Sequence, residues 1–262
     1  MFLRHPRHRA LTACTVLVLA LFGTAAFAPL PFSVAQPGLT ADVLGKDDGT
    51  PVITVSGVPV RATTGQLRMV TIAATGPSTD VHLGQVIDGW FRTDRAVMPR
   101  EAVYPTGGSD AEIERHNLAE MKESQDSATQ AAQGYLGGSS AKARVTLRLA
   151  DVGGPSAGLL FSLGIVDKLR GDGHGGDLTG GKTIAGTGTI SADGKVGAVG
   201  GVPLKTQSAA RDGATVFLVP KAECADARSE LPHGLRLVPV TTLKGAVSAL
   251  LALKKGGSVP SC

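Results

Sequence analysis

The sequence predicts an α+β fold, with mixed sheet layers and packed helices, behind one N-terminal transmembrane helix. Three observations carry this prediction. An uncharged apolar run covers residues 11–28, alternating strand patterns cover 51–60 and 65–74, and further strands alternate with apolar helices in the second half. About 230 residues remain beyond the apolar run, which is enough for one substantial core, so we expect one main domain.

The apolar run is just long enough to cross a bilayer, and residues 1–9 carry three arginines, Arg4, Arg7 and Arg9, and no acid. A positive flank is typical of a segment whose N-terminus stays in the cytoplasm, so we expect a single-pass cell-membrane protein with an extracytoplasmic domain. A cleaved signal peptide, with Ser33-Val34-Ala35 before the cut, is the competing interpretation. Without the three arginines the net charge falls from +4 to +1, which indicates no nucleic-acid partner.

We expect four segments along the chain. Residues 1–35 form a cytoplasmic stub and the transmembrane anchor, and 36–50, QPGLTADVLGKDDGT, form a turn-rich linker. The main domain covers 51–252, with a short helix at 81–90. Residues 253–262 form a C-terminal tail.

The most informative stretch is DVGGPSAGLLFSLGIVDKL at 151–169. The alternating residues 144–149 predict a half-buried strand, Gly153 and Gly154 end it, and Pro155 suits the first position of a helix. That helix is apolar nearly all round, which predicts burial. Its N-terminus directs backbone N–H groups at Ser156, so Ser156 is a candidate nucleophile; the alternative is a helix-capping serine.

A second Gly-rich turn, GKVGAVGGVPLK at 194–205, opens another helix with Lys205 on its first turn. A serine hydroxyl needs a base, and a lysine serves as one only when desolvation lowers its pKa toward the working pH. The neighbours of Lys205 are apolar, and the closest acids in sequence are Asp193 and Asp212. The alternative interpretation is an ordinary solvated surface lysine.

With both motifs in this order, the chain resembles the proteolytic domain of Lon, in which a catalytic serine in a P-S-A-G turn pairs with a lysine in a G-G-x-x-x-K turn. IAGTGTI at 184–190 resembles its T-G-E strand segment, and AARDGATVFLVP at 209–220 its closing helix and strand. The likeness is strongest over 144–250. MKESQDSATQAAQGYLG at 121–137 is similar to the first helix of that domain, and the upstream residues resemble the membrane-anchored, PDZ-containing Lon-like proteases, which have no ATPase module.

Three departures accompany the resemblance. Only GYLGGSSAK, residues 134–142, stands where the related proteins hold a PDZ domain. Thr189 replaces the glutamate of the T-G-E segment, and Gly153 replaces an aspartate, with Asp151 two places earlier. The lysine follows the serine at a spacing somewhat larger than usual, and the Gly-rich loop 170–181 accommodates the excess.

The resemblance implies an ATP-independent serine endopeptidase that acts on proteins. Ser156 attacks the scissile carbonyl, Lys205 takes and returns the proton, and Thr187 orients Lys205. It also implies assembly as a hexamer, and it implies no cofactor. GDLTGGKT at 176–183 satisfies a phosphate-loop pattern, but a strand-like segment follows where a helix is required, so we interpret Lys182 as a surface lysine and expect no ATP site.

Two alternatives of other classes stay open. One is a Ser-His-Asp hydrolase in which Asp226 and His233 complete the site of Ser156. The other is a non-catalytic membrane scaffold that keeps the same fold. Cys224 and Cys262 either form a disulfide or leave Cys262 free on a disordered tail, and no metal-ligand spacing of histidines or cysteines appears.

Overall fold

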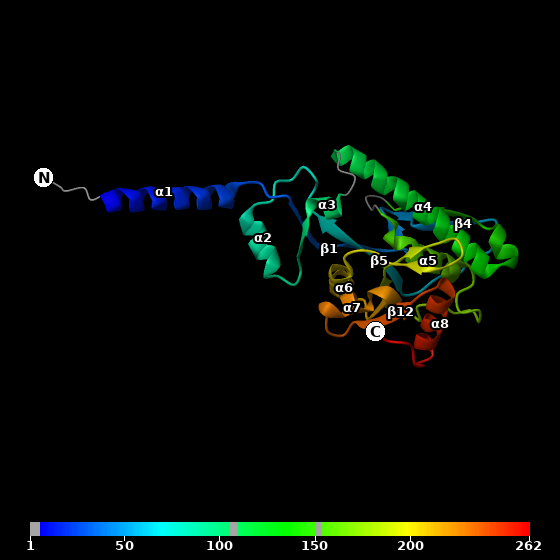
Figure 1. The fold of residues 1–262 in the computed structure, drawn as a ribbon. Helices are drawn as coiled ribbons and strands as arrows, with labels where there is room; N and C mark the ends of the chain where they lie inside the picture. Colours follow the sequence, from blue (N-terminus) through cyan, green and yellow to red (C-terminus); the bar gives the residue numbers. More distant parts are fainter. Residues whose placement is uncertain (1–5, 105–108, 150–153) are drawn as a thin grey trace. The chain divides into compact units, whose positions relative to one another are not determined.

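The computed structural model describes residues 6–104, 109–149 and 154–262, and Figure 1 shows its helices and strands. The chain divides into two compact units. Unit 1 comprises Met1–Ala35 and Ala74–Asp110, and unit 2 comprises Gln36–Ala73 and Ala111–Cys262. Arg4, Asp151 and Gly153, which the sequence analysis singled out, lie outside the described residues.

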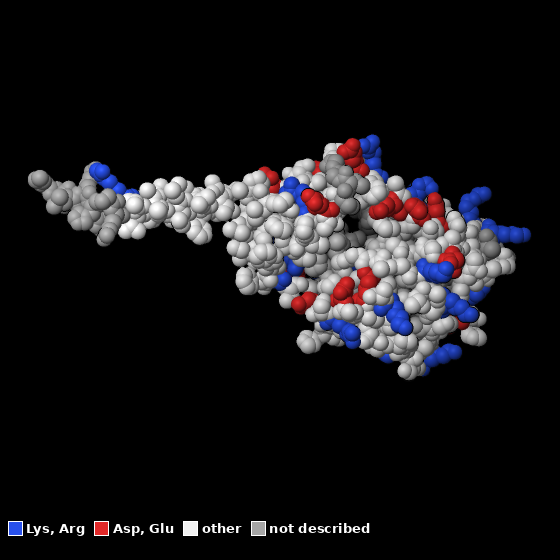
Figure 2. Space-filling model, in the orientation of Figure 1, with Lys and Arg blue, Asp and Glu red and all other residues white. Residues whose placement is uncertain are grey.

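Unit 1 begins with the long helix α1 (Pro6–Phe27). Arg9–Phe27 within it is 19 residues long, with mean hydropathy 2.1, and is the one helix of the described residues long and apolar enough to cross a membrane. A signal sequence near an N-terminus passes the same test of length and composition. Figure 2 shows the apolar part of this helix without charged side chains.

The rest of unit 1 is small. The first residues of β1 (Phe32–Asp42) pair antiparallel with β6 (Ala96–Pro99), and α2 (Leu83–Trp90) and α3 (Arg100–Val103) flank this ladder. The short helix that the sequence predicts at 81–90 is therefore present. A minor core of Val34, Val81 and Val86 holds the unit together.

Unit 2 is built on a sheet with the strand order β12-β11-β8-β5-β1. β5 (Gln66–Ala74), β8 (Thr183–Gly186), β11 (Val216–Pro220) and β12 (Arg236–Val240) run parallel to one another. Gly186 permits the close approach of β8 to β11, since a Cβ there would lie 2.9 Å from the carbonyl oxygen of Leu218.

Helices cover both faces of this sheet (Figure 1). Along each strand, side chains alternate between the two faces. On one face, residues such as Leu67 and Leu218 pack with α4 (Asp110–Leu136), α5 (Gly158–Leu169) and α8 (Leu243–Lys254). On the other face, Val70 and Phe217 pack with α6 (Val202–Arg211) and α7 (Cys224–Ser229). The mixed sheet with packed helices confirms the predicted fold class.

Short elements complete unit 2. β4 (Ile53–Ser56) pairs antiparallel with β7 (Arg144–Leu147), β9 (Thr189–Ile190) with β10 (Val196–Gly197), and β2 (Lys46–Asp47) with β3 (Thr50–Pro51). The 3-10 turns are η1 (Gly138–Lys142), η2 (Pro155–Ala157) and η3 (Lys221–Glu223).

Two expectations for chain segments were wrong. Residues 36–50 are not a turn-rich linker, because most of β1 lies there and Val43 and Leu44 join the core. The predicted strand at 51–60 ends at Ser56. At the C-terminus, Val259 is buried and Cys262 forms a disulfide with Cys224, so the last residues are attached to the fold.

Candidate active site

Ser156 lies on the 3-10 turn η2, directly before helix α5. Gly154 precedes the turn with φ 92°, a left-handed conformation that suits glycine, and Pro155 occupies the first position of the turn. The sequence predicted the proline-led start, but the strand before it, β7, ends at Leu147, earlier than the predicted 144–149. The side chain of Ser156 is half-buried, which leaves it within reach of a substrate.

Two neighbouring elements hold this turn by hydrogen bonds. The Ser124 hydroxyl, on α4, donates to the Pro155 carbonyl at 3.0 Å. From the connection between β8 and β9, the Gly188 N–H donates to the Ser156 carbonyl at 2.9 Å and the Thr187 hydroxyl to the same oxygen at 3.4 Å. The backbone of the candidate nucleophile is therefore fixed from both sides.

Helix α5 is buried along most of its length, as its apolar composition predicts. The sequence predicted that its first backbone N–H groups point at Ser156, but two of them bind other acceptors. The Leu159 N–H donates to the Gly188 carbonyl at 3.1 Å, and the Gly158 N–H donates to the Pro155 carbonyl. These two donors are occupied, so at those positions the helix contributes its dipole and not free N–H groups to the site of Ser156.

Lys205 lies in the first half of α6, after Gly201, which adopts φ 70°. Only 4% of Lys205 is exposed, so it is not the solvated surface lysine of the alternative interpretation. Burial lowers the pKa of Lys205 to about 8, and the negative charge of Glu223 opposes part of this shift. Within the described residues no carboxylate forms an ion pair with Lys205.

The acid that acts on Lys205 is Glu223, which the sequence analysis missed. Glu223 ends η3, directly after β11, and only 8% of it is exposed. Its carboxylate accepts a hydrogen bond from the Val199 N–H at 3.0 Å, on the loop that leads into α6, and burial raises its pKa. Asp193 and Asp212, the nearest acids in sequence, instead pair with Lys195 and Arg211.

Thr187 is fully buried at the end of β8. Its N–H donates to the Leu218 carbonyl at 3.0 Å, which continues the pairing of β8 with β11, and its hydroxyl donates to the Ser156 carbonyl. Thr187 therefore connects the sheet to the serine turn.

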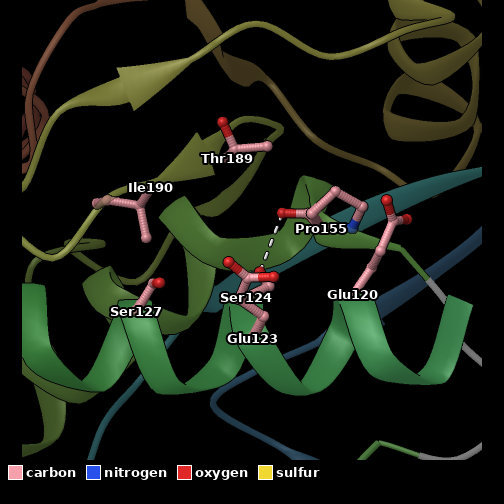
Figure 3. A pocket seen from close by; sticks show the side chains of 7 residues that line it. All are labelled: Glu120, Glu123, Ser124, Ser127, Pro155, Thr189 and Ile190. Atoms are coloured by element: carbon pink, nitrogen blue, oxygen red, sulfur yellow. Dashed lines mark hydrogen bonds between the residues drawn. The ribbon is translucent and has the colours of Figure 1, made fainter. Parts of the chain in front are cut away.

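A cavity of about 290 Å³ lies beside this turn. Figure 3 shows Ser124, Ser127 and two glutamates of α4 on one side, with Thr189 and Ile190 of β9 opposite and Pro155 between them. The glutamates are Glu120 and Glu123, and Figure 2 shows acidic side chains along α4. The cavity adjoins Pro155, the residue before Ser156, and it is acidic on the side formed by α4.

The residues of the alternative triad lie apart from this arrangement. His233 is exposed in the turn before β12, and Asp226 is exposed on α7. Within the described residues neither side chain forms a hydrogen bond or ion pair with the other or with Ser156. Lys182 of the phosphate-loop pattern is exposed and followed by β8, so the helix that a phosphate loop requires is missing there.

Residues 150–252 match the family model of the Lon protease (S16) C-terminal proteolytic domain. The matched range contains Ser156, Thr187, Lys205 and Glu223, and it includes β8, β11 and β12 with helices α5 to α8. Over these residues, this confirms the resemblance to the Lon proteolytic domain. The chain carries a Lon-like proteolytic domain, which implies serine peptidase activity on protein substrates.

Proposed function

We propose that this chain is an ATP-independent, membrane-anchored, extracytoplasmic serine endopeptidase that uses a dyad of Ser156 and Lys205. The observation that carries the proposal is the burial of Lys205 without an ion-paired carboxylate in the described residues, which holds its pKa at about 8. A lysine with that pKa is partly neutral near physiological pH and accepts a proton. An exposed lysine is almost fully charged there and does not.

The proposed reaction has two halves. Neutral Lys205 takes the hydroxyl proton of Ser156 while Oγ attacks the scissile carbonyl carbon, and the resulting ammonium returns the proton to the leaving amine. An acyl-enzyme ester remains. Lys205 then takes a proton from water, the hydroxide attacks the ester carbonyl, and Ser156 regains its proton as the carboxylate product leaves.

We assign Thr187 the role of orienting Lys205. Two facts support a place for it at the centre of the site: its complete burial and the hydrogen bond of its hydroxyl to the Ser156 carbonyl. In this proposal Thr187 is a positioning residue, and its substitution lowers kcat more than it raises KM.

The proposed limits of the proteolytic domain are 51–252, behind a stub and anchor over 1–35, with a tail over 253–262. β1 adds a strand from the preceding segment. Two features support an extracytoplasmic domain. The apolar part of α1 follows an arginine-rich start, and the Cys224–Cys262 disulfide suits an oxidising compartment. Assembly as a hexamer rests on likeness to Lon-type proteins and is tested by native mass spectrometry.

Cleavage of unfolded casein by the full chain in lipid nanodiscs, without nucleotide, tests the proposal. We expect Ser156→Ala and Lys205→Ala to abolish cleavage, while the control Lys182→Ala, an exposed lysine, and His233→Ala leave it intact. Circular dichroism checks the folding of each variant. Loss of cleavage in His233→Ala favours the Ser-His-Asp alternative, and a folded parent that cleaves nothing favours the scaffold.

A further inference from the structure

Helix α2 of unit 1 carries apolar side chains on two faces. Val86 and Gly89 face the unit and are buried. Ile87, Trp90 and Phe91 are spaced at i, i+3 and i+4, so they share the other face, and they are 43%, 66% and 86% exposed. A helix that meets only water carries polar side chains on its outer face, so this face requires an apolar environment.

The chain connects this helix closely to the apolar span of α1. Helix α1 ends at Phe27, and the Leu30 N–H, three residues later, donates to the Val81 carbonyl at 2.8 Å. Helix α2 begins two residues after Val81, and α1 and α2 contact each other within unit 1 (Figure 1). Three extended residues reach at most about 10 Å, so α2 lies close to the end of α1.

Bilayer dimensions place that end at the membrane surface. The 19-residue apolar span is about 28 Å long as a helix, close to the hydrocarbon thickness of about 30 Å. When α1 spans the membrane, Phe27 therefore lies at the boundary between hydrocarbon and headgroups. Tryptophan and other aromatic side chains concentrate in this zone, because their rings are amphipathic.

The charges around α2 also suit a lipid surface. Asp88, the one charged residue within the helix, pairs with Arg95 at 2.7 Å, and Arg92 pairs with Asp94 at 2.7 Å. Residues 83–95 thus carry no net charge, so α2 and the turn after it do not repel anionic headgroups.

We propose that the Ile87, Trp90 and Phe91 face of α2 inserts into the outer headgroup region of the bilayer that α1 spans, and so holds unit 1 to the membrane at a second point. This inference rests on the membrane anchoring in the proposed function. A helix lying in the interface next to a spanning helix stops rotation of unit 1 about the axis of α1.

Trp90 is the only tryptophan in the chain, so its fluorescence reports on this face alone. The test reconstitutes the full chain in phosphatidylcholine–phosphatidylglycerol vesicles, with and without lipids brominated near the headgroup end of the acyl chains. We expect quenching of Trp90 by the brominated lipids and protection from acrylamide in the water. Acrylamide protection without bromine quenching means that protein covers this face, and overturns the proposal; so does free access of acrylamide.

A double substitution tests the face itself. We expect Ile87→Ser combined with Phe91→Ser to abolish the bromine quenching of Trp90, while the control Leu39→Ser, at a 72%-exposed leucine of unit 2, preserves it. Quenching that persists in the double variant overturns the assignment. Flotation separates this inference from the anchoring: a chain that does not float with vesicles contradicts the anchor, and one that floats with an unquenched Trp90 contradicts only the docking of α2.

Discussion

Glu223→Gln tests whether the buried carboxylate sets the pH at which the site works. Glutamine keeps a side-chain oxygen that accepts the Val199 N–H, and it removes the negative charge that favours the ammonium form of Lys205. Burial then acts alone on Lys205, so its pKa falls further below its usual range. We therefore expect the rise of kcat/KM with pH to move to lower pH in the variant.

The size of the expected change in kcat/KM follows from the titration of Lys205 in the parent. With a pKa of about 8 for Lys205, the neutral fraction is about one tenth at pH 7 and about nine tenths at pH 9. In the parent, kcat/KM therefore increases close to tenfold across this interval. Well below the pKa, each unit by which it falls gives about ten times more neutral lysine, so Glu223→Gln is faster than the parent at pH 7 and similar to it at pH 9.

The assay is the cleavage of a fluorogenic peptide between pH 6 and 10 by the full chain in nanodiscs. Glu230→Gln, at an exposed glutamate beyond the end of α7, is the matched control and keeps the profile of the parent. A parent rate that does not rise between pH 7 and 9 refutes Lys205 as the base. An unshifted profile in a folded Glu223→Gln variant refutes the role of Glu223.

Three further predictions concern the scaffold. Gly158→Ala places a Cβ 3.0 Å from both Ile190 and Ser124, so we expect the serine turn to shift and peptide cleavage to fall at least tenfold, with circular dichroism unchanged. Burial raises the pKa of the Asp167 carboxyl from 3.8 to about 6. The folded state therefore loses about 3 kcal/mol of stability as the pH rises through these two values and the carboxyl ionises. We expect urea unfolding at pH 4 and pH 7 to show this loss in the parent and not in Asp167→Asn. Cys262→Ser opens a disulfide that spans 38 residues, and urea unfolding should show a loss of up to about 4 kcal/mol.

Local signals explain which parts of the site the sequence predicted. Gly154 and Pro155 set the start of the serine turn, and an unbroken apolar run marks α5 as a buried helix. The same local reasoning failed at β1, where Pro37 and Gly38 suggest a turn. Gly38 instead serves the sheet, because a Cβ there would lie 2.8 Å from the backbone of Thr71 in unit 2.

Long-range packing explains what the sequence did not reveal. Local sequence left a solvated surface lysine open as the alternative for Lys205, whereas α6 packs against the second face of the sheet and Lys205 is buried. Glu223 lies 18 residues after Lys205 in sequence. Its charge acts on the lysine because β11 continues directly into η3, which carries Glu223. The acidic cavity likewise arises because α4 lies opposite β9 beside Pro155.

The energetic cost of the buried lysine explains why an acid near it is useful. A pKa of about 8 in place of 10.5 means that the folded state loses about 3 kcal/mol, relative to an exposed lysine, at any pH where Lys205 is charged. The loss is present below pH 8 and disappears as pH rises toward 10.5. Since a domain is stable by only about 5–15 kcal/mol, burial with no nearby carboxylate would take more of that margin. The negative charge of Glu223 limits this loss because it favours the ammonium form of Lys205. Because Glu223 forms no ion pair with Lys205 in the described part of the chain, the pKa still stays at about 8, and the lysine is partly neutral and able to act as a base.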